Sequence, residues 1–178
     1  MLKKILLIIV ILITAFVIAV ELQPKDFRIA RSITIAAPAA TVFAQVNDLH
    51  KFQNWSPWAK LDPNAKTTYS GPATGVGSAF SWDGNNQVGA GTMTNIASQP
   101  NNLLRFRLDF AKPFKGTNTS EFTFKPDGDQ TVVTWSMSGQ STNFLCKAMS
   151  LVMNCDKIVG GEFEKGLADL KSVSEAKQ

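Results

Sequence analysis

Side chains that commonly take part in acid–base, nucleophilic or metal chemistry are few in this sequence and lie far apart along it. The 178 residues include one histidine, His50, and two cysteines, Cys146 and Cys155. Zinc sites need about four nitrogen, sulfur or oxygen ligands at close spacing, and no such group occurs. The glycines between residues 71 and 91 do not form the glycine-rich turn into a helix that binds phosphate groups. The sequence therefore predicts no metal and no other cofactor.

Acidic side chains within the strand-like runs have the wrong parity for an internal catalytic site. Asp83, Asp109 and Glu121 alternate with the apolar residues of their runs, so we expect them to face solvent. His50 is followed by Lys51 in a short helical stretch and is interpreted as a surface residue. A nucleophile with its base, or an acid with an orienting partner, is not recognisable. The sequence therefore predicts no catalytic residue set.

The composition is that of a single globular domain with a nearly balanced charge. Apolar residues make up 44% of the chain, which excludes a disordered protein. The net charge of +4 includes Lys3 and Lys4 of an apolar N-terminal tail, and the remainder holds 16 basic against 14 acidic residues. Nucleic-acid binding normally rests on clustered Lys and Arg, so a nucleic-acid partner is not predicted.

The N-terminal segment, residues 1–22, is predicted to be a transmembrane anchor or a signal segment. From Ile5 to Val20 the only polar residue is Thr14, and about 1.5 Å per residue gives a helix of about 24 Å. The run exceeds the length usual for a signal peptide, which favours a single-pass anchor, although a cleavage site near Ala19 is the alternative. By the positive-inside rule, Lys3 and Lys4 stay cytoplasmic, which predicts an extracytoplasmic soluble domain.

In that compartment Cys146 and Cys155 form a candidate disulfide, with two free thiols as the alternative. In one continuous helix, nine residues of separation place the two cysteines on opposite faces, about 13 Å apart. A bridge therefore requires a helix break, which Asn154 or Asp156 would supply as a cap.

The rest of the chain predicts an α+β domain, because strand-like and helix-like periodicities follow one another. Residues 27–35 alternate as a strand, and two short helical pieces follow at residues 38–46 and 48–55, after which Pro57 is expected to stop the helix. Six further strand-like runs separated by turn residues imply consecutive antiparallel hairpins. Their ranges are 66–69, 78–82, 88–98, 103–110, 117–125 and 131–138. Residues 156–173 carry an apolar stripe typical of an amphipathic helix.

Four segments, taken together with this order, resemble the helix-grip superfamily of START domains, polyketide cyclases and birch-pollen-allergen-like proteins, often called SRPBCC. These segments are Ile33–Phe43 (ITIAAPAATVF), Asn54–Trp58 (NWSPW), Gly75-Val-Gly77 followed by Trp82, and Phe163–Lys171 (FEKGLADLK). The resemblance implies a helix-grip domain over residues 27–174, in which a curved seven-stranded antiparallel sheet wraps around a long C-terminal helix. It also implies an apolar cavity, which holds lipids, sterols or aromatic metabolites in many relatives.

Strand alternation and the stripe of the last helix predict which side chains surround this cavity, with ordinary core packing as the alternative. Trp55 and Trp58 flank Pro57 and are expected to form a lid, to pack on the sheet edge or to contact a membrane interface. Gly166 fits either close packing or an open cavity. We expect no titratable side chain to enter the cavity. The predicted lining residues are Trp58, Phe80, Trp82, Phe106, Phe110, Phe122, Trp135, Met137, Met153, Phe163 and Leu167.

The sequence-based hypothesis is a membrane-anchored domain that binds a small hydrophobic molecule, such as a lipid or an aromatic metabolite. Two alternatives remain open at this point. One is a cyclase- or dehydratase-type enzyme that acts in the same cavity, and the other is a protein-interaction module without a ligand. The ligand and the oligomeric state are not predicted.

Overall fold

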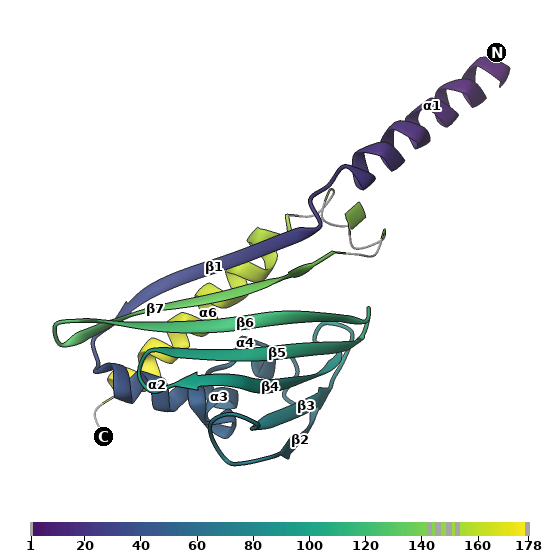
Figure 1. The fold of residues 1–178 in the computed structure, drawn as a ribbon. Helices are drawn as coiled ribbons and strands as arrows, with labels where there is room; N and C mark the ends of the chain where they lie inside the picture. The colour runs from purple at the N-terminus through teal and green to yellow at the C-terminus, as the bar shows by residue number, and fades with distance from the viewer. Residues whose placement is uncertain (1, 142–143, 145–146, 149–150, 152–153, 177–178) are drawn as a thin grey trace.

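One antiparallel sheet and a long helix across it form the body of the protein (Figure 1). The computed structural model describes residues 2–141, 144, 147–148, 151 and 154–176. Within these residues seven strands lie in the order β1-β7-β6-β5-β4-β3-β2. Six sequential strands are joined by hairpins, and β1 pairs with the last of them, β7. The strands are β1 (Asp26–Ile35), β2 (Lys66–Ser70), β3 (Ala79–Asp83), β4 (Ala90–Gln99), β5 (Leu103–Lys112), β6 (Gly116–Asp127) and β7 (Gln130–Gln140).

The helices are α1 (Leu2–Glu21), α2 (Ala39–Asn47), α3 (Leu49–Trp55), α4 (Pro57–Leu61) and α6 (Cys155–Glu175). The described chain therefore has three short helices after β1, where the sequence predicts two. Pro57 begins α4 rather than only ending the previous helix. A proline is well tolerated at the first helical position, because its missing N–H would have no partner inside the helix there.

Helices α2 and α3 fill one half of the concave face of the sheet. Val42, Val46 and Leu49 are buried there in the same hydrophobic core as Phe122 and Phe124. Trp55 is fully buried as well, and its indole N–H donates to the carbonyl oxygen of Gln45 over 3.2 Å. Trp55 is therefore a core residue, and the expectation of a lid or membrane-contact role does not hold for it.

Gly166 lets α6 approach the sheet and the start of α4 closely. A Cβ atom at this position would lie 2.8 Å from the Trp135 ring and 3.0 Å from the ring of Pro57. Real Cβ atoms do not approach other atoms so closely, so the glycine serves close packing rather than an open cavity. The same helix buries Phe163, Leu167 and Leu170 against the sheet, as the predicted apolar stripe requires.

Arg31 interrupts the apolar inward face of β1 and fastens this strand to the first turns of α6. Its guanidinium donates to the Asp156 carboxylate over 2.9 Å and to the Glu164 carboxylate over 2.7 Å. It also donates to the backbone oxygen of Asp156 over 3.0 Å. A Cβ atom at Gly160 would overlap the guanidinium, so the glycine makes room for this contact.

Replacing Arg31 by methionine is expected to lower the thermal unfolding midpoint of the full chain by several degrees at neutral pH. The hydrogen bond from Arg31 holds the pKa of Asp156 below its ordinary value of 3.8. A carboxyl group with a lowered pKa stabilises the fold fully above its ordinary pKa, and this stabilisation is lost as the pH falls toward the lowered value. The difference between the two proteins should therefore shrink below about pH 4.

Circular dichroism melts between about pH 7 and about pH 3 measure this difference. Lys165→Met is the matched control, because the Lys165 side chain is 67% exposed and its ion pair lies within α6, on Glu162. A loss of the same size at every pH would show that the methionine acts through packing rather than through the carboxylate.

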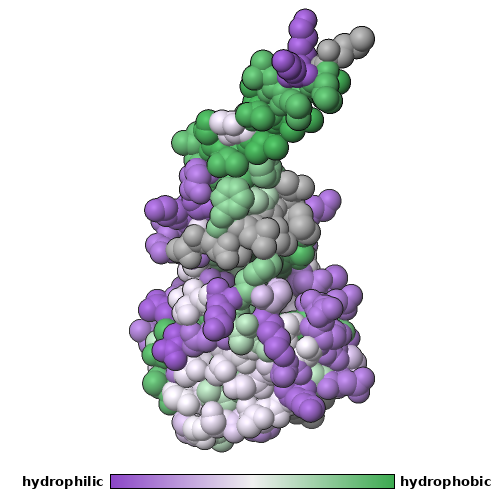
Figure 2. Space-filling view, turned by 90° about the vertical axis from the view of Figure 1, so that its right-hand side faces the viewer, coloured by the Kyte–Doolittle hydropathy of each residue, from purple (hydrophilic) through white to green (hydrophobic). Residues whose placement is uncertain are grey.

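Helix α1 projects away from the domain at the end where β1 begins (Figure 1). It is long and apolar enough to cross a membrane, and a signal sequence would meet the same description. Its side chains are exposed except near its end, where Val20 is fully buried. Figure 2 shows the apolar surface of this helix above the more polar body of the domain.

Of the two cysteines in the candidate disulfide, the structure describes Cys155. Cys155 is exposed and begins α6, and the side chain of Asn154 caps that helix by accepting from the Lys157 N–H over 2.9 Å. Cys146 lies outside the described residues, as does Met153 of the predicted lining. The pairing of the two cysteines therefore stays a prediction.

Candidate functional site

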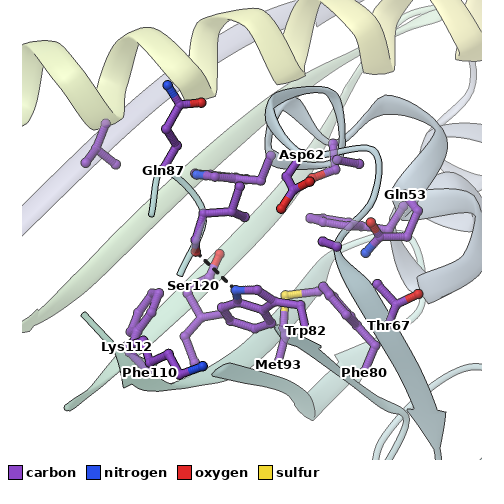
Figure 3. Close-up of a pocket in the computed structure, with 18 of the residues that line it drawn as sticks. Gln53, Asp62, Thr67, Phe80, Trp82, Gln87, Met93, Phe110, Lys112 and Ser120 are labelled. Carbon is purple, nitrogen blue, oxygen red and sulfur yellow. Dashed lines mark hydrogen bonds between the residues drawn. The ribbon is translucent and has the colours of Figure 1, made fainter. Parts of the chain in front are cut away.

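A cavity of about 540 Å³ lies between the concave face of the sheet, helices α3 and α4, and the first turns of α6 (Figure 3). Pockets that enclose drug-sized molecules are typically about 300–1,000 Å³ in volume. Most of its wall is apolar and much of it aromatic. Besides residues that the sequence predicts, the aromatic and aliphatic part of the wall holds Phe52, Tyr69, Met93, Leu108 and Val159.

The predicted lining residues divide into a cavity group and a core group. The cavity group comprises Trp58, Phe80, Trp82, Phe110, Trp135, Met137 and Phe163. The core group comprises Phe106, Phe122 and Leu167, which are at most 1% exposed and do not line the cavity. The division follows from α2 and α3, which occupy the half of the concave face over the core group. Phe52 of α3 shows this directly, because its ring meets Phe122 edge to face.

Trp135 is the centre of the aromatic wall. Its ring stacks on Phe163 of α6 with centroids 4.2 Å apart and on Phe122 of β6 with centroids 4.8 Å apart. Trp58 of α4 meets both Trp135 and Phe163 edge to face. Such offset-stacked and edge-to-face pairs are favourable arrangements of aromatic rings. The four elements that hold these rings, β6, β7, α4 and α6, therefore support one another around the cavity.

Trp82 forms the opposite part of the wall and lies over a glycine of the neighbouring strand. A Cβ atom at Gly91 would lie 2.7 Å from its ring, so this position of β4 must lack a side chain. The Trp82 N–H donates to the Val88 carbonyl oxygen over 3.2 Å (Figure 3). This bond fixes the ring at the hairpin between β3 and β4, close to Phe110.

Ser120 is a buried polar group within the apolar wall. Its side-chain oxygen accepts a hydrogen bond from the Trp135 N–H over 2.9 Å, and the residue is 3% exposed. A hydroxyl group that accepts one bond still has its own proton to donate. In the part of the chain that the structure describes, no hydrogen bond uses that proton. Ser120 can therefore donate to an acceptor oxygen of a bound molecule.

Ser120 is not among the lining residues predicted from the sequence, although its position in the strand is a signal for it. Ser120 has the same strand parity as Phe122 and Phe124, which places its side chain on the concave face of β6. Its small polar side chain is not part of the apolar pattern that identifies the other lining residues.

Two charged residues border the cavity, which differs from the expectation that no titratable side chain enters it. Asp62 and Lys112 belong to the connection after α4 and to the end of β5. An oxygen of Asp62 accepts from the Asn85 backbone N–H over 2.7 Å, and Lys112 forms a 3.0 Å ion pair with Asp83. Asp62 caps the end of helix α4 and Lys112 ends strand β5, and strand alternation does not describe side-chain direction at such positions.

The other titratable residues considered in the sequence do not line the cavity. The Glu121 carboxylate pairs with Arg105 over 2.7 Å, and Asp109 accepts from the Thr117 hydroxyl over 2.8 Å. The latter bond holds the pKa of Asp109 below its ordinary value. The His50 side chain is 62% exposed and stacks on the ring of Tyr69.

Burial raises the pKa of the Tyr69 hydroxyl above its ordinary value of 10.0. Tyr69 therefore contributes a protonated hydroxyl group to the residues that line the cavity at neutral pH.

The chain is similar to known proteins over nearly the whole region after α1. The model of a protein family described as "Polyketide cyclase / dehydrase and lipid transport" matches residues 26–175. No curated protein matches the sequence.

Solved structures share the fold at low sequence identity. A protein from Nitrosospira multiformis is 20% identical, with a TM-score of 0.61 over 84% of this chain and 97% of that one. The ginseng major latex-like protein 151 from Panax ginseng is 14% identical, with a TM-score of 0.62 over 85% of this chain and 99% of that one. A protein from Mesorhizobium loti is also 14% identical, with a TM-score of 0.62 over 85% of this chain and all of that one. At these identities the likeness concerns the fold alone.

Proposed function

Because the chain belongs to the polyketide cyclase / dehydrase and lipid transport family, we propose that its domain binds a small hydrophobic molecule, a lipid or an aromatic metabolite, in the cavity. The observation that carries this proposal is an apolar cavity of about 540 Å³ whose wall includes the buried hydroxyl group of Ser120. Burial of the ligand's apolar surface supplies affinity, and a few polar contacts set its orientation.

Ser120 is the group that we expect to orient the ligand. It lies on the strand β6 and is held in place by its bond to Trp135, so it can donate in a fixed direction. A carbonyl, carboxyl or hydroxyl oxygen at one end of the ligand would accept this bond. Lys112 at the edge of the cavity would favour an acidic group there, although its ion pair with Asp83 competes.

We further propose that α1 anchors the domain in a membrane as a single pass, with the domain on the extracytoplasmic side. The apolar length of α1 and the paired lysines at its start, Lys3 and Lys4, support this orientation. The ligand of a domain held beside a bilayer is then available in the bilayer itself.

In the described part of the cavity wall, two observations favour ligand binding over a cyclase-type reaction. The carboxyl groups of Asp109 and Glu121 face away from the cavity and are engaged by neighbouring side chains. Asp62 lies at the edge, where backbone N–H groups of Asn64 and Asn85 occupy its two oxygens. Proton transfer to a bound substrate needs a group within hydrogen-bond reach of it.

The full chain in phosphatidylcholine nanodiscs, titrated with the fluorescent fatty acid cis-parinaric acid, tests the proposal. Trp58, Trp82 and Trp135 line the cavity, so energy transfer from tryptophan to the bound probe reports binding at this place. We expect the energy transfer to saturate in the parent chain. A variant in which a larger side chain fills the cavity should not show it. If neither parinaric acid nor the planar probe anilinonaphthalene sulfonate binds saturably, the proposed function is wrong.

Ser120→Ala is expected to weaken parinaric acid binding by about twofold to tenfold, which corresponds to one net hydrogen bond. Binding of diphenylhexatriene, a hydrocarbon probe without an acceptor, should change little. The ratio of the two affinities is the measurement, because any general damage to the wall would affect both probes. Thr67→Ala is the control, since Thr67 also lines the cavity but is exposed. Equal losses for both probes would contradict an orienting role for Ser120.

A further inference from the structure

The cavity extends to the end of the domain from which helix α1 projects. Asp26, the first residue of β1, lies opposite Gln140, the last residue of β7, and the next strand, β6, begins beside them at the same end. The cavity edge is built from the chain segments at this end, including Lys112 and Pro113 after β5 and Gln87 after β3. Figure 1 shows α1 leaving the domain from this end of the sheet.

Large apolar side chains are exposed around this end. They lie in four separate segments, namely the linker after α1, the β5–β6 turn, the connection after β7 and the first turn of α6. Large apolar side chains exposed on several segments at one end of a domain are candidates for a contact surface. We call these residues the apolar rim, which comprises Leu22 (79% exposed), Phe114 (36%), Phe144 (43%), Leu151 (39%) and Ile158 (51%).

Basic side chains accompany the apolar rim. Lys25 precedes β1, Lys115 follows Phe114 and Lys157 precedes Ile158. Among the described residues no carboxylate lies within ion-pair distance of these three lysines. Basic groups next to exposed apolar groups match the chemistry of a bilayer surface, where phosphate groups lie above acyl chains.

The connection between α1 and the domain keeps the apolar rim close to any bilayer that holds α1. Four residues, 22–25, join α1 to β1, and at about 3.5 Å per residue they span at most about 14 Å. The end of α1 also contacts the rest of the chain, since Val20 is fully buried and Glu21 forms a 3.2 Å ion pair with Lys147. The Lys147 side chain is 5% exposed and that of Glu21 is 60% exposed, so a buried lysine of the domain reaches the end of α1.

We propose that the apolar rim docks on the surface of the bilayer that contains α1, so that a lipid-like ligand passes from this bilayer into the cavity without crossing bulk water. This inference rests on the proposed function, because it assumes the α1 anchor and a hydrophobic ligand. The docked surface is the outer face of the chain's own membrane.

Contact with acyl chains can be measured directly in the reconstituted full chain. Phe114→Trp places a fluorescent ring on the apolar rim, and quenching by brominated phosphatidylcholine is compared with that of the parent chain. Val76→Trp is the matched control, because Val76 is 59% exposed in the connection between β2 and β3, at the opposite end of the sheet. We expect added quenching for the residue at 114 and none for the residue at 76. Equal quenching at the two positions, or none at 114, would overturn the docked orientation.

Transfer of the ligand gives a second, independent test. In the double variant Phe114→Glu, Ile158→Glu, uptake of parinaric acid from the host vesicle should slow by about tenfold, while the final bound amount stays unchanged. Neither residue lines the cavity. Val76→Glu should leave the rate unchanged.

The outcomes separate the two proposals. An unchanged uptake rate in the double variant, with a normal final bound amount, would contradict the docking proposal but not the binding function. Absence of binding in the parent chain would sink the binding function, and the bromine quenching would still decide whether the rim touches the bilayer.

Discussion

Met137→Trp is expected to lower the affinity of the full chain for parinaric acid by at least about a hundredfold. The Met137 side chain is part of the cavity wall and is only half-buried, so a larger side chain there occupies the space of the ligand. The indole would displace part of the apolar contacts of the ligand, and a hundredfold loss of affinity corresponds to about 2.7 kcal/mol. The fluorescence of the bound probe, excited directly, measures the affinity without interference from the added tryptophan.

Val132→Trp is the control for this prediction. Val132 belongs to the same strand but has the opposite parity, so its side chain lies on the convex face. This variant should bind parinaric acid as the parent chain does, and both variants should keep the secondary structure seen by circular dichroism. Unchanged affinity in a folded Met137→Trp chain would show that the ligand binds elsewhere.

Trp135→Ala is expected to have the largest effect on stability, a loss of about 3–5 kcal/mol in the free energy of unfolding. Trp135 is 2% exposed and joins β7 to α6 through the ring of Phe163. Its removal leaves an empty space in the centre of the aromatic wall. It also removes the hydrogen-bond donor that Ser120 accepts from. Urea unfolding of the reconstituted full chain, followed by circular dichroism, measures the loss.

Two further variants separate the parts of this effect. Trp135→Phe keeps a ring against Phe163 but removes the N–H group, so it should cost less than the alanine variant. Trp58→Ala removes a partly exposed ring from the edge of the same cluster and should also cost less. A loss below about 1 kcal/mol for Trp135→Ala would mean that the wall does not depend on this ring.

The family and the fold are both predictable from the residue pattern of the chain. The alternation in each strand and the four-, four- and three-residue spacing of Val159, Phe163, Leu167 and Leu170 identify the face that each element buries. The seven strands of the described chain and α6 confirm this architecture. Parity also placed Asp109 and Glu121 outside the cavity, because the side-chain direction in a strand follows from its local geometry.

The sequence by itself determined the order of elements and the inward or outward direction of most strand residues, since both depend on neighbours along the chain. Only the tertiary structure decided which inward residues surround a cavity and which fill a core. Phe122 and Trp135 are adjacent on paired strands and both face the concave side, yet the cavity reaches Trp135 and stops short of Phe122. The boundary is set by how far α2 and α3 reach across the sheet, and by the close approach that Gly166 permits. Such packing joins segments distant in sequence, so no local pattern records it.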